Sequence, residues 1–118
     1  NTALAWKTLG VVLYNTNRLE EARQAHHRAL AIDPEFADAC LRLAYVESRL
    51  GPLHDPVALL RRAAAILPND VAIRRALGQH LLATRDFRGA VRELEWVLAK
   101  TSDGAISSQL AEARRRVQ

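Results

Sequence analysis

The chain has 118 residues, of which 49% are apolar, so it is large and apolar enough to form one domain with a hydrophobic core and is not expected to be disordered. No run approaches the roughly 18 apolar residues of a membrane helix, and the first ten residues lack the pattern of a signal peptide, so we expect a soluble protein without membrane insertion and favour the cytoplasm slightly. The net charge of +4 is concentrated in residues 69–118, which carry nine Lys and Arg against six Asp and Glu.

Groups of helix-breaking residues interrupt an otherwise helical pattern rich in Ala, Leu, Arg and Glu. Six such groups occur, the first at 15–17 and the last at 101–104. They leave seven predicted helices, over 3–15, 19–32, 37–50, 56–67, 71–84, 87–100 and 105–117. The joins are short, so neighbouring helices should form antiparallel hairpins. Asp55 and Pro56 read as an N-cap followed by a proline in the first helical position, where its missing N–H costs nothing.

A fixed period runs through these helices. Pro34 and Pro68 are separated by one step of this period, and the same step relates the pairs 9–10, 43–44 and 77–78, which read Leu-Gly, Leu-Ala and Leu-Gly. Small residues at the second position of each pair would let the two helices of a hairpin approach closely. The step of about 34 residues is the length of a tetratricopeptide repeat.

Residues 3–36 carry the pattern of that family in order, with Trp6, Leu9, Gly10, Ala22, Ala29 and Pro34. The chain therefore resembles the tetratricopeptide repeat family. The later repeats depart from the pattern: Cys40 and Arg74 stand at the Trp position, Glu47 stands at an aromatic position, and Ser102 replaces the final Pro.

The resemblance implies an all-α fold, a right-handed α-solenoid of three helix-turn-helix repeats plus a C-terminal capping helix. We expect a single domain over 1–118, with repeats at about 3–36, 37–70 and 71–103 and the capping helix at about 105–117. The residues expected in the core are Leu9, Gly10, Ala22, Leu43, Ala44, Leu77, Gly78, Ala90 and Leu94. In the last helix, Ile106, Leu110 and Ala113 should turn onto the third repeat, which requires this last step to be one residue shorter than the earlier ones.

The sequence offers no catalytic constellation, no metal site and no cofactor-binding motif, so we predict a protein that is not an enzyme and uses no cofactor. The histidines at 26–27, 54 and 80 lack the i, i+4 spacing that places two imidazoles on one helical face. His26 occupies a position where the family usually packs an aromatic ring, so we expect it to be a partly buried packing residue. Cys40 is expected to be a small buried hydrophobic residue.

The family's best-known peptide site is a clamp that grips the C-terminal carboxylates of heat-shock chaperones. It uses Lys and Asn in the first repeat, Asn in the second, and Lys and Arg in the third. Here Lys7 matches the first Lys, but Val11 and Arg42 replace the two Asn residues, and Ala72 and Ala76 replace the last Lys and Arg. One match in five excludes that specificity.

In the resembled architecture, the first helices of successive repeats line a concave groove. The predicted partner-binding residues in that groove are Lys7, Val11, Tyr14, Leu41, Arg42, Tyr45, Arg49, Arg75, Gln79 and Leu82. They combine cations with rigid aromatic and apolar contact area. We therefore predict a protein–protein interaction scaffold whose groove binds an acidic or amphipathic protein segment or peptide.

Three alternatives remain open at this stage. The repeats could mediate homotypic assembly or act as a spacer, which would make the chain a homo-oligomer. They could also form an accessory array that selects substrates for a larger enzyme. Nucleic-acid binding ranks last and no specific nucleic acid is expected, because Arg114, Arg115 and Arg116 would be spread around a helix and no aromatic residues are interleaved with them.

Overall fold

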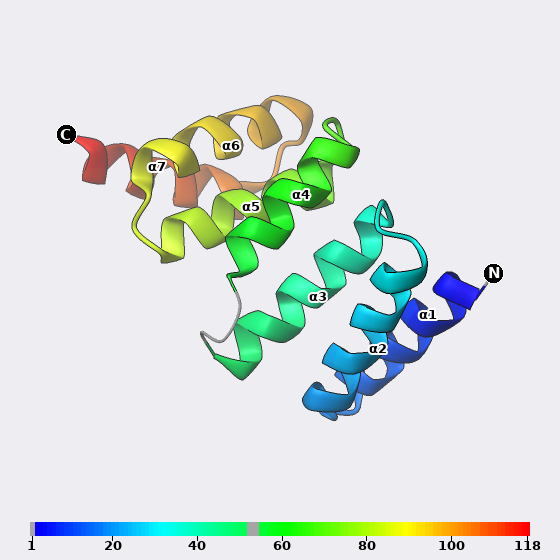
Figure 1. The fold of residues 1–118 in the computed structure, drawn as a ribbon. Coiled ribbons are helices and arrows are strands. Elements are labelled where there is room, and N and C mark those ends of the chain that lie inside the picture. The colour runs from blue at the N-terminus through cyan, green and yellow to red at the C-terminus, as the bar shows by residue number, and fades with distance from the viewer. Residues whose placement is uncertain (1, 52–54) are drawn as a thin grey trace. The chain divides into compact units, whose positions relative to one another are not determined.

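The computed structural model describes residues 2–51 and 55–118, and these residues form seven α-helices without a β-strand. The helices are α1 (Thr2–Asn15), α2 (Leu19–Ile32), α3 (Ala37–Leu50), α4 (Pro56–Ile66), α5 (Val71–Ala83), α6 (Phe87–Lys100) and α7 (Gly104–Val117) (Figure 1). Each bound lies within one residue of its prediction, and the all-α class is confirmed. The single domain and the right-handed sense of the stack stay predictions. None of the described helices is long and apolar enough to span a membrane.

Aspartate side chains fix the starts of four helices. Each accepts a hydrogen bond from a backbone N–H of the first turn, at 2.9–3.0 Å. The four caps are Asp55 on α4, Asp70 on α5, Asp86 on α6 and Asp103 on α7. A cap satisfies an N–H that has no partner within the helix and typically contributes about 1 kcal/mol. The predicted start of α4 at Asp55 is confirmed.

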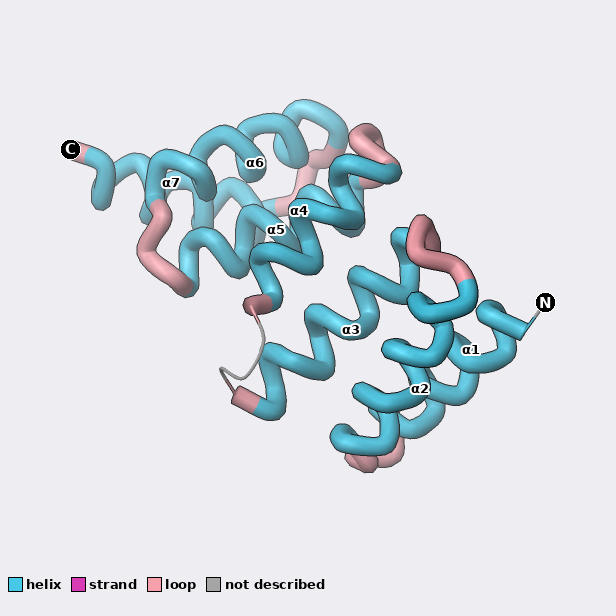
Figure 2. Tube along the Cα trace, in the orientation of Figure 1, coloured by secondary structure: helices cyan, strands magenta, loops and turns pink. Residues whose placement is uncertain are grey.

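Two hairpin turns share one backbone geometry. Asn17 closes the α1–α2 turn with a φ of 65°, and Arg85 closes the α5–α6 turn with a φ of 69°. A positive φ is uncommon outside glycine. The two residues lie two repeat lengths apart. They therefore take equivalent positions, and the first and third repeats close with the same left-handed residue. The short loops that carry these turns are visible in Figure 2.

The chain divides into two compact units, residues 1–67 and 68–118. In the first unit, α1 packs against α2, α2 against α3, and α3 against α4. One cluster of this core contains Leu13, Ala22, Ala25 and Val46, with Trp6, Tyr14 and Leu50 packed against it. Helices from both repeats of the unit thus share one apolar interior.

A buried ion pair crosses that interior from α2 to α3. The Arg23 guanidinium donates to both carboxylate oxygens of Glu47, at 2.5 and 3.1 Å, and also to Glu20 at 2.8 Å. Glu47 is fully buried, and Arg23 is 8% exposed. Replacing either partner would leave an uncompensated buried charge, which typically reduces the free energy of unfolding by about 3–5 kcal/mol. The pair explains why Glu47 can stand where the repeat pattern has an aromatic residue.

The second unit contains α5, α6 and α7. Helix α6 packs against both α5 and α7, and α7 also touches α5. The largest buried side chains of this unit are Ile73, Leu77, Leu81, Leu94, Val97, Ile106 and Leu110. Ile106, Leu110 and Ala113 are at most 2% exposed, so the predicted orientation of the last helix is confirmed.

Close approach between the helices of a hairpin explains the small residues of the repeat. A Cβ built on Gly10 would lie 2.6 Å from Cε1 of His26 on α2, and one built on Gly78 would lie 2.8 Å from Cδ2 of Leu94 on α6. Both distances are shorter than real Cβ contacts. Ala44 takes the same position in the second repeat and is fully buried. In the first and third repeats, any side chain at the glycine position would displace its neighbour.

Eight of the nine predicted core residues are buried, and the prediction for Leu9 is wrong. Leu9 is 44% exposed, whereas Leu43, which takes the same position in the second repeat, is 1% exposed. Helix α3 packs against α2, which precedes it, and among the described residues no helix precedes α1. The same sequence position is therefore buried in one repeat and exposed in the other.

Replacing Gly78 with leucine should overpack the α5–α6 hairpin and reduce the free energy of unfolding by about 1–3 kcal/mol or more. Thermal and urea unfolding monitored by circular dichroism measures the change. Gly104→Leu is the matched control, because a Cβ at Gly104 meets nothing within 4 Å. Equal stability of the two variants would contradict the assigned packing.

Deleting residues 105–118 should expose the α6 surface that Ile106 and Leu110 cover. The loss of this burial should lower stability by several kcal/mol and promote aggregation. Unfolding curves and light scattering test this expectation, with a chain trimmed only at Val117 and Gln118 as the control. A monomeric truncated protein with an unshifted melting curve would show that α7 contributes no cap.

Candidate peptide-binding face

Six of the predicted partner-binding residues lie together on helices of the first unit. We call this set the α1–α3 face: Lys7, Val11, Tyr14, Arg42, Tyr45 and Arg49. Val11, Tyr14, Arg42 and Tyr45 line one cavity of about 80 Å³, together with Asn15 and His26. We call this the Tyr14–Tyr45 cavity. The structure thus brings four of the predicted residues together around one cavity, and their role in binding a partner stays a prediction.

An ion pair and a ring contact join α1 to α3 beside this cavity, and a second ion pair lies within α3. Lys7 Nζ lies 3.1 Å from Asp38 Oδ2, and Arg42 Nε lies 3.5 Å from Asp38 Oδ1. The guanidinium of Arg49 stacks 5.1 Å from the centre of the Tyr14 ring and donates to Asn17 Oδ1 at 2.8 Å. Lys7 and Arg42 therefore share one carboxylate, and Arg49 adds a third cation to the face. This excess favours an acidic ligand over a basic one.

Leu41 does not belong to the face, and its prediction as an apolar contact is corrected. Only 5% of Leu41 is exposed. Adjacent residues on a helix point about 100° apart, so Leu41 turns into the packing where Arg42 turns toward the cavity.

The three remaining predicted residues lie on α5, in the second unit. Arg75, Gln79 and Leu82 are spaced i, i+4 and i+7 and are all partly exposed. Arg75 Nη2 lies 3.7 Å from Asp103 Oδ2, and the Gln79 amide donates to Gln109 Oε1 on α7 at 3.3 Å. That these residues extend the α1–α3 face stays a prediction.

His26 is more deeply buried than the partly buried packing residue that the sequence predicts. It is fully buried, and neither Nδ1 nor Nε2 has a hydrogen-bond partner among the residues that the structure describes. The same position of the second and third repeats is taken by Leu60 and Leu94, which are also fully buried. The first repeat thus has an imidazole where the other two have leucine. Aligning the second helices of the repeats would have revealed the substitution.

The surroundings of His26 disfavour its charged form. Burial, followed by the positive charge of Arg42, lowers the pKa of His26 from 6.5 to about 4. Lys7 and His27 add to this effect and Asp38 opposes it. His26 is therefore a neutral imidazole at pH 7, with one N–H donor and one acceptor nitrogen.

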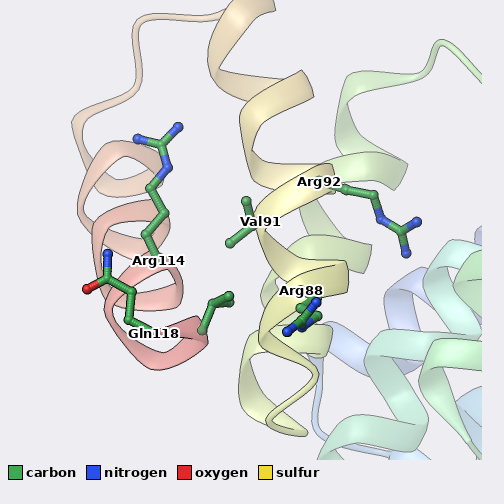
Figure 3. Close-up of a pocket in the computed structure, with 6 residues that line it drawn as sticks. Arg88, Val91, Arg92, Arg114 and Gln118 are labelled. Atoms are coloured by element: carbon green, nitrogen blue, oxygen red, sulfur yellow. The ribbon is translucent and has the colours of Figure 1, made fainter.

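A second, larger groove lies between α6 and α7. Figure 3 shows four of the residues that line it: Val91 and Arg92 on α6, Arg114 on α7, and Gln118, which follows α7. The groove has a volume of about 590 Å³ and is also lined by Arg88 and Val117. Arg114 is paired with Glu95 at 3.0 Å. The sequence pattern does not predict this groove, because its lining comes from helix edges that face each other only after packing.

The titratable side chains of the described residues form no metal-binding cluster. No cluster of three or more His, Cys, Asp or Glu side chains occurs in the part of the chain that the structure describes, and His54 lies outside that part. Cys40 is fully buried, as predicted, and burial raises the pKa of its thiol.

Comparison with known families decides the nature of the helical repeat. The model of the tetratricopeptide repeat family matches residues 3–36. These residues are a tetratricopeptide repeat. The resemblance inferred from Trp6, Gly10, Ala22 and Pro34 is confirmed.

Curated relatives match part of the chain only. A peroxisomal targeting signal receptor of Kluyveromyces lactis is 47% identical over 51 residues, which make up 43% of this chain and 9% of that receptor. The corresponding receptor of Saccharomyces cerevisiae has the same identity over 8% of its length. The chain thus spans a small fraction of these receptors.

Solved structures of tetratricopeptide repeat proteins share the fold over nearly the whole chain. The first TPR of Spaghetti (RPAP3), bound to the HSP90 peptide SRMEEVD, aligns with a TM-score of 0.90 at 17% identity and covers 98% of this chain and 93% of that one. The Sgt2 TPR domain of Aspergillus fumigatus aligns with a TM-score of 0.84 at 18% identity, over 98% and 78% of the two chains. Identities this low establish the helical repeat fold alone.

The buried imidazole of the first repeat gives a test based on pH. A base whose pKa is lowered by folding binds its proton more weakly in the folded state, so stability is lost as the pH falls from 6.5 toward 4. For His26 this loss is on the order of 3 kcal/mol. His26→Leu should remove this loss and also raise stability at pH 7 by about 1–3 kcal/mol, the cost of an unpaired buried polar group.

Urea unfolding at pH 7, 5.5 and 4 measures both effects. His80→Leu serves as the control, because His80 is partly exposed and its Nδ1 contacts the Ala76 carbonyl at 2.9 Å. If the His26→Leu variant still loses stability as the pH falls, the loss belongs to other titratable groups.

Proposed function

We propose that this chain is a non-enzymatic scaffold that binds an acidic or amphipathic protein segment on the α1–α3 face. The observation that carries the proposal is the Tyr14–Tyr45 cavity, whose walls combine two tyrosines, Val11 and Arg42. Rigid aromatic side chains and arginine supply most of the binding energy in many protein interfaces. The face thus offers apolar contact area and a cation beside one another.

The charge of the face supports an acidic ligand. Lys7 and Arg42 share the carboxylate of Asp38, and Arg49 adds a third cation to the face. Complementary charge accelerates association and fixes the register of a bound segment. The residues of the family's chaperone clamp are absent at Val11, Arg42, Ala72 and Ala76, so the preferred segment differs from a chaperone tail.

The comparisons support peptide binding in general terms. The matched relatives are named as receptors of a peroxisomal targeting signal, and one structural neighbour is bound to an HSP90 peptide.

Homotypic assembly is the second candidate function. Leu9 and Val12 on α1 are 44% and 53% exposed, which leaves an apolar strip that another copy of the chain could cover. Sedimentation velocity across a range of concentrations distinguishes the two functions, because assembly raises the measured mass with concentration and peptide binding does not.

Combining Arg42→Glu with Arg75→Glu should weaken the binding of an acidic segment more than tenfold, or by about 1.4 kcal/mol or more. The segment is obtained by panning a random peptide library against the wild-type chain, and its affinity is measured by calorimetry. Both residues are partly exposed, so helicity should be unchanged.

A matched pair on the other surface controls for net charge. Arg88→Glu with Arg92→Glu makes the same charge change at the α6–α7 groove. Wild-type affinity in the first double variant, with a loss in the second, would transfer the function to that groove.

A further inference from the structure

The unpaired imidazole of His26 needs an explanation that packing does not supply. Its two ring nitrogens are buried and have no hydrogen-bond partner within residues 2–51 and 55–118. At the same position, the second and third repeats bury Leu60 and Leu94, which carry no polar atom to satisfy. A buried polar group without a partner destabilises the fold. A site that keeps such a group is a candidate for ligand contact.

The imidazole lines a cavity that has room for a small group. The Tyr14–Tyr45 cavity, of about 80 Å³, is several times larger than the ~10–15 Å³ that one water molecule requires. Gly10 makes this arrangement possible, because a Cβ there would lie within 2.9 Å of three atoms of the imidazole. The ring thus occupies space that the glycine leaves open on α1.

A second buried donor reaches the same cavity from α3. Arg42 Nε is buried without a hydrogen bond, since its 3.5 Å contact with Asp38 is an ion-pair contact whose geometry does not form one. Asn15, at the end of α1, adds an amide that can donate. Three potential donors from three helices therefore converge on one small space with aromatic walls.

We infer that the Tyr14–Tyr45 cavity is an anchor subsite for a single carboxylate of the bound segment, held by the N–H groups of Arg42, His26 and Asn15. A carboxylate accepts several hydrogen bonds, and bonds to charged donors are the strong ones. The two tyrosine rings cover the apolar part of the residue that carries it. This inference rests on the proposed function and names the chemistry that the face selects.

The contribution from α2 distinguishes this subsite from a clamp built on first helices only. The imidazole reaches the cavity from behind the α1–α3 face, through the gap at Gly10. Its N–H is preorganised, because the buried ring is held by the packing of α1 against α2. Preorganised donors lose little entropy when a ligand binds.

Nuclear magnetic resonance titration with three small probes tests the subsite on the full chain. N-acetyl-glutamate N-methylamide carries a side-chain carboxylate, N-acetylglycine carries a chain-terminal carboxylate, and N-acetyl-glutamine N-methylamide is the uncharged control. We expect at least one carboxylate probe to shift the ring nitrogens of His26 and the Nε–Hε of Arg42 saturably. The affinity should be on the order of millimolar, as expected for so few atoms. The carboxylate probe that binds more tightly shows whether the subsite prefers a side-chain or a chain-terminal carboxylate.

Three variants locate the binding. The affinity for the carboxylate probe should fall at least fivefold in His26→Leu, which copies the second and third repeats. It should fall as much in His26→Phe, which keeps an aromatic ring. Arg42→Gln should do the same. Arg61→Gln removes a charge from an exposed position on α4 that lines none of the cavities described above, and should leave the affinity unchanged.

The inference is overturned if the glutamine probe binds as well as the glutamate probe, if no probe saturates, or if both His26 variants retain wild-type affinity. These results would leave His26 as a packing residue with a water partner. The charge-reversal test on Arg42 and Arg75 separates this failure from that of the proposed function. A peptide that loses affinity on charge reversal but not in His26→Leu would keep the binding face and remove the anchor.

Discussion

The contact between the two helices of each hairpin is the constraint on which the rest of the structure depends. At Gly10 and Gly78, the partner helix comes so close that even a methyl group would collide with His26 or Leu94. Only helices that meet at this level can bury their leucines and valines at native density. The 34-residue period of the sequence places a small residue at this position in each repeat: Gly10, Ala44 and Gly78.

The core of the first unit also contains buried polar side chains. The three buried polar side chains of the described residues, Arg23, His26 and Glu47, all belong to it. Arg23 and Glu47 neutralise each other across α2 and α3, so their burial is balanced. His26 has no such partner. The contrast separates a polar pair that supports the fold from a polar group available to a ligand.

Two surfaces of different character follow from the packing. The α1–α3 face has a small cavity with buried donors, which suits one well-defined group. The groove between α6 and α7 is larger and open, with Val91 and Val117 between arginines. Small enclosed sites with fixed donors give specificity, whereas open grooves add area. The proposed scaffold therefore relies on the first unit for recognition.

The sequence alone determined the helices, the repeat and most of the core, because caps, breakers and periodic small residues act locally or at a fixed step. It also placed Tyr14, Arg42 and Tyr45 on one face by helical spacing. Tertiary structure decided the rest. Leu9 fits the core pattern but is exposed, since burial depends on a neighbouring helix. Leu41 is buried, and the ring nitrogens of His26 have no hydrogen-bond partner among the described residues. The sequence could not predict either result, because the surroundings of a side chain are set by helices distant in sequence.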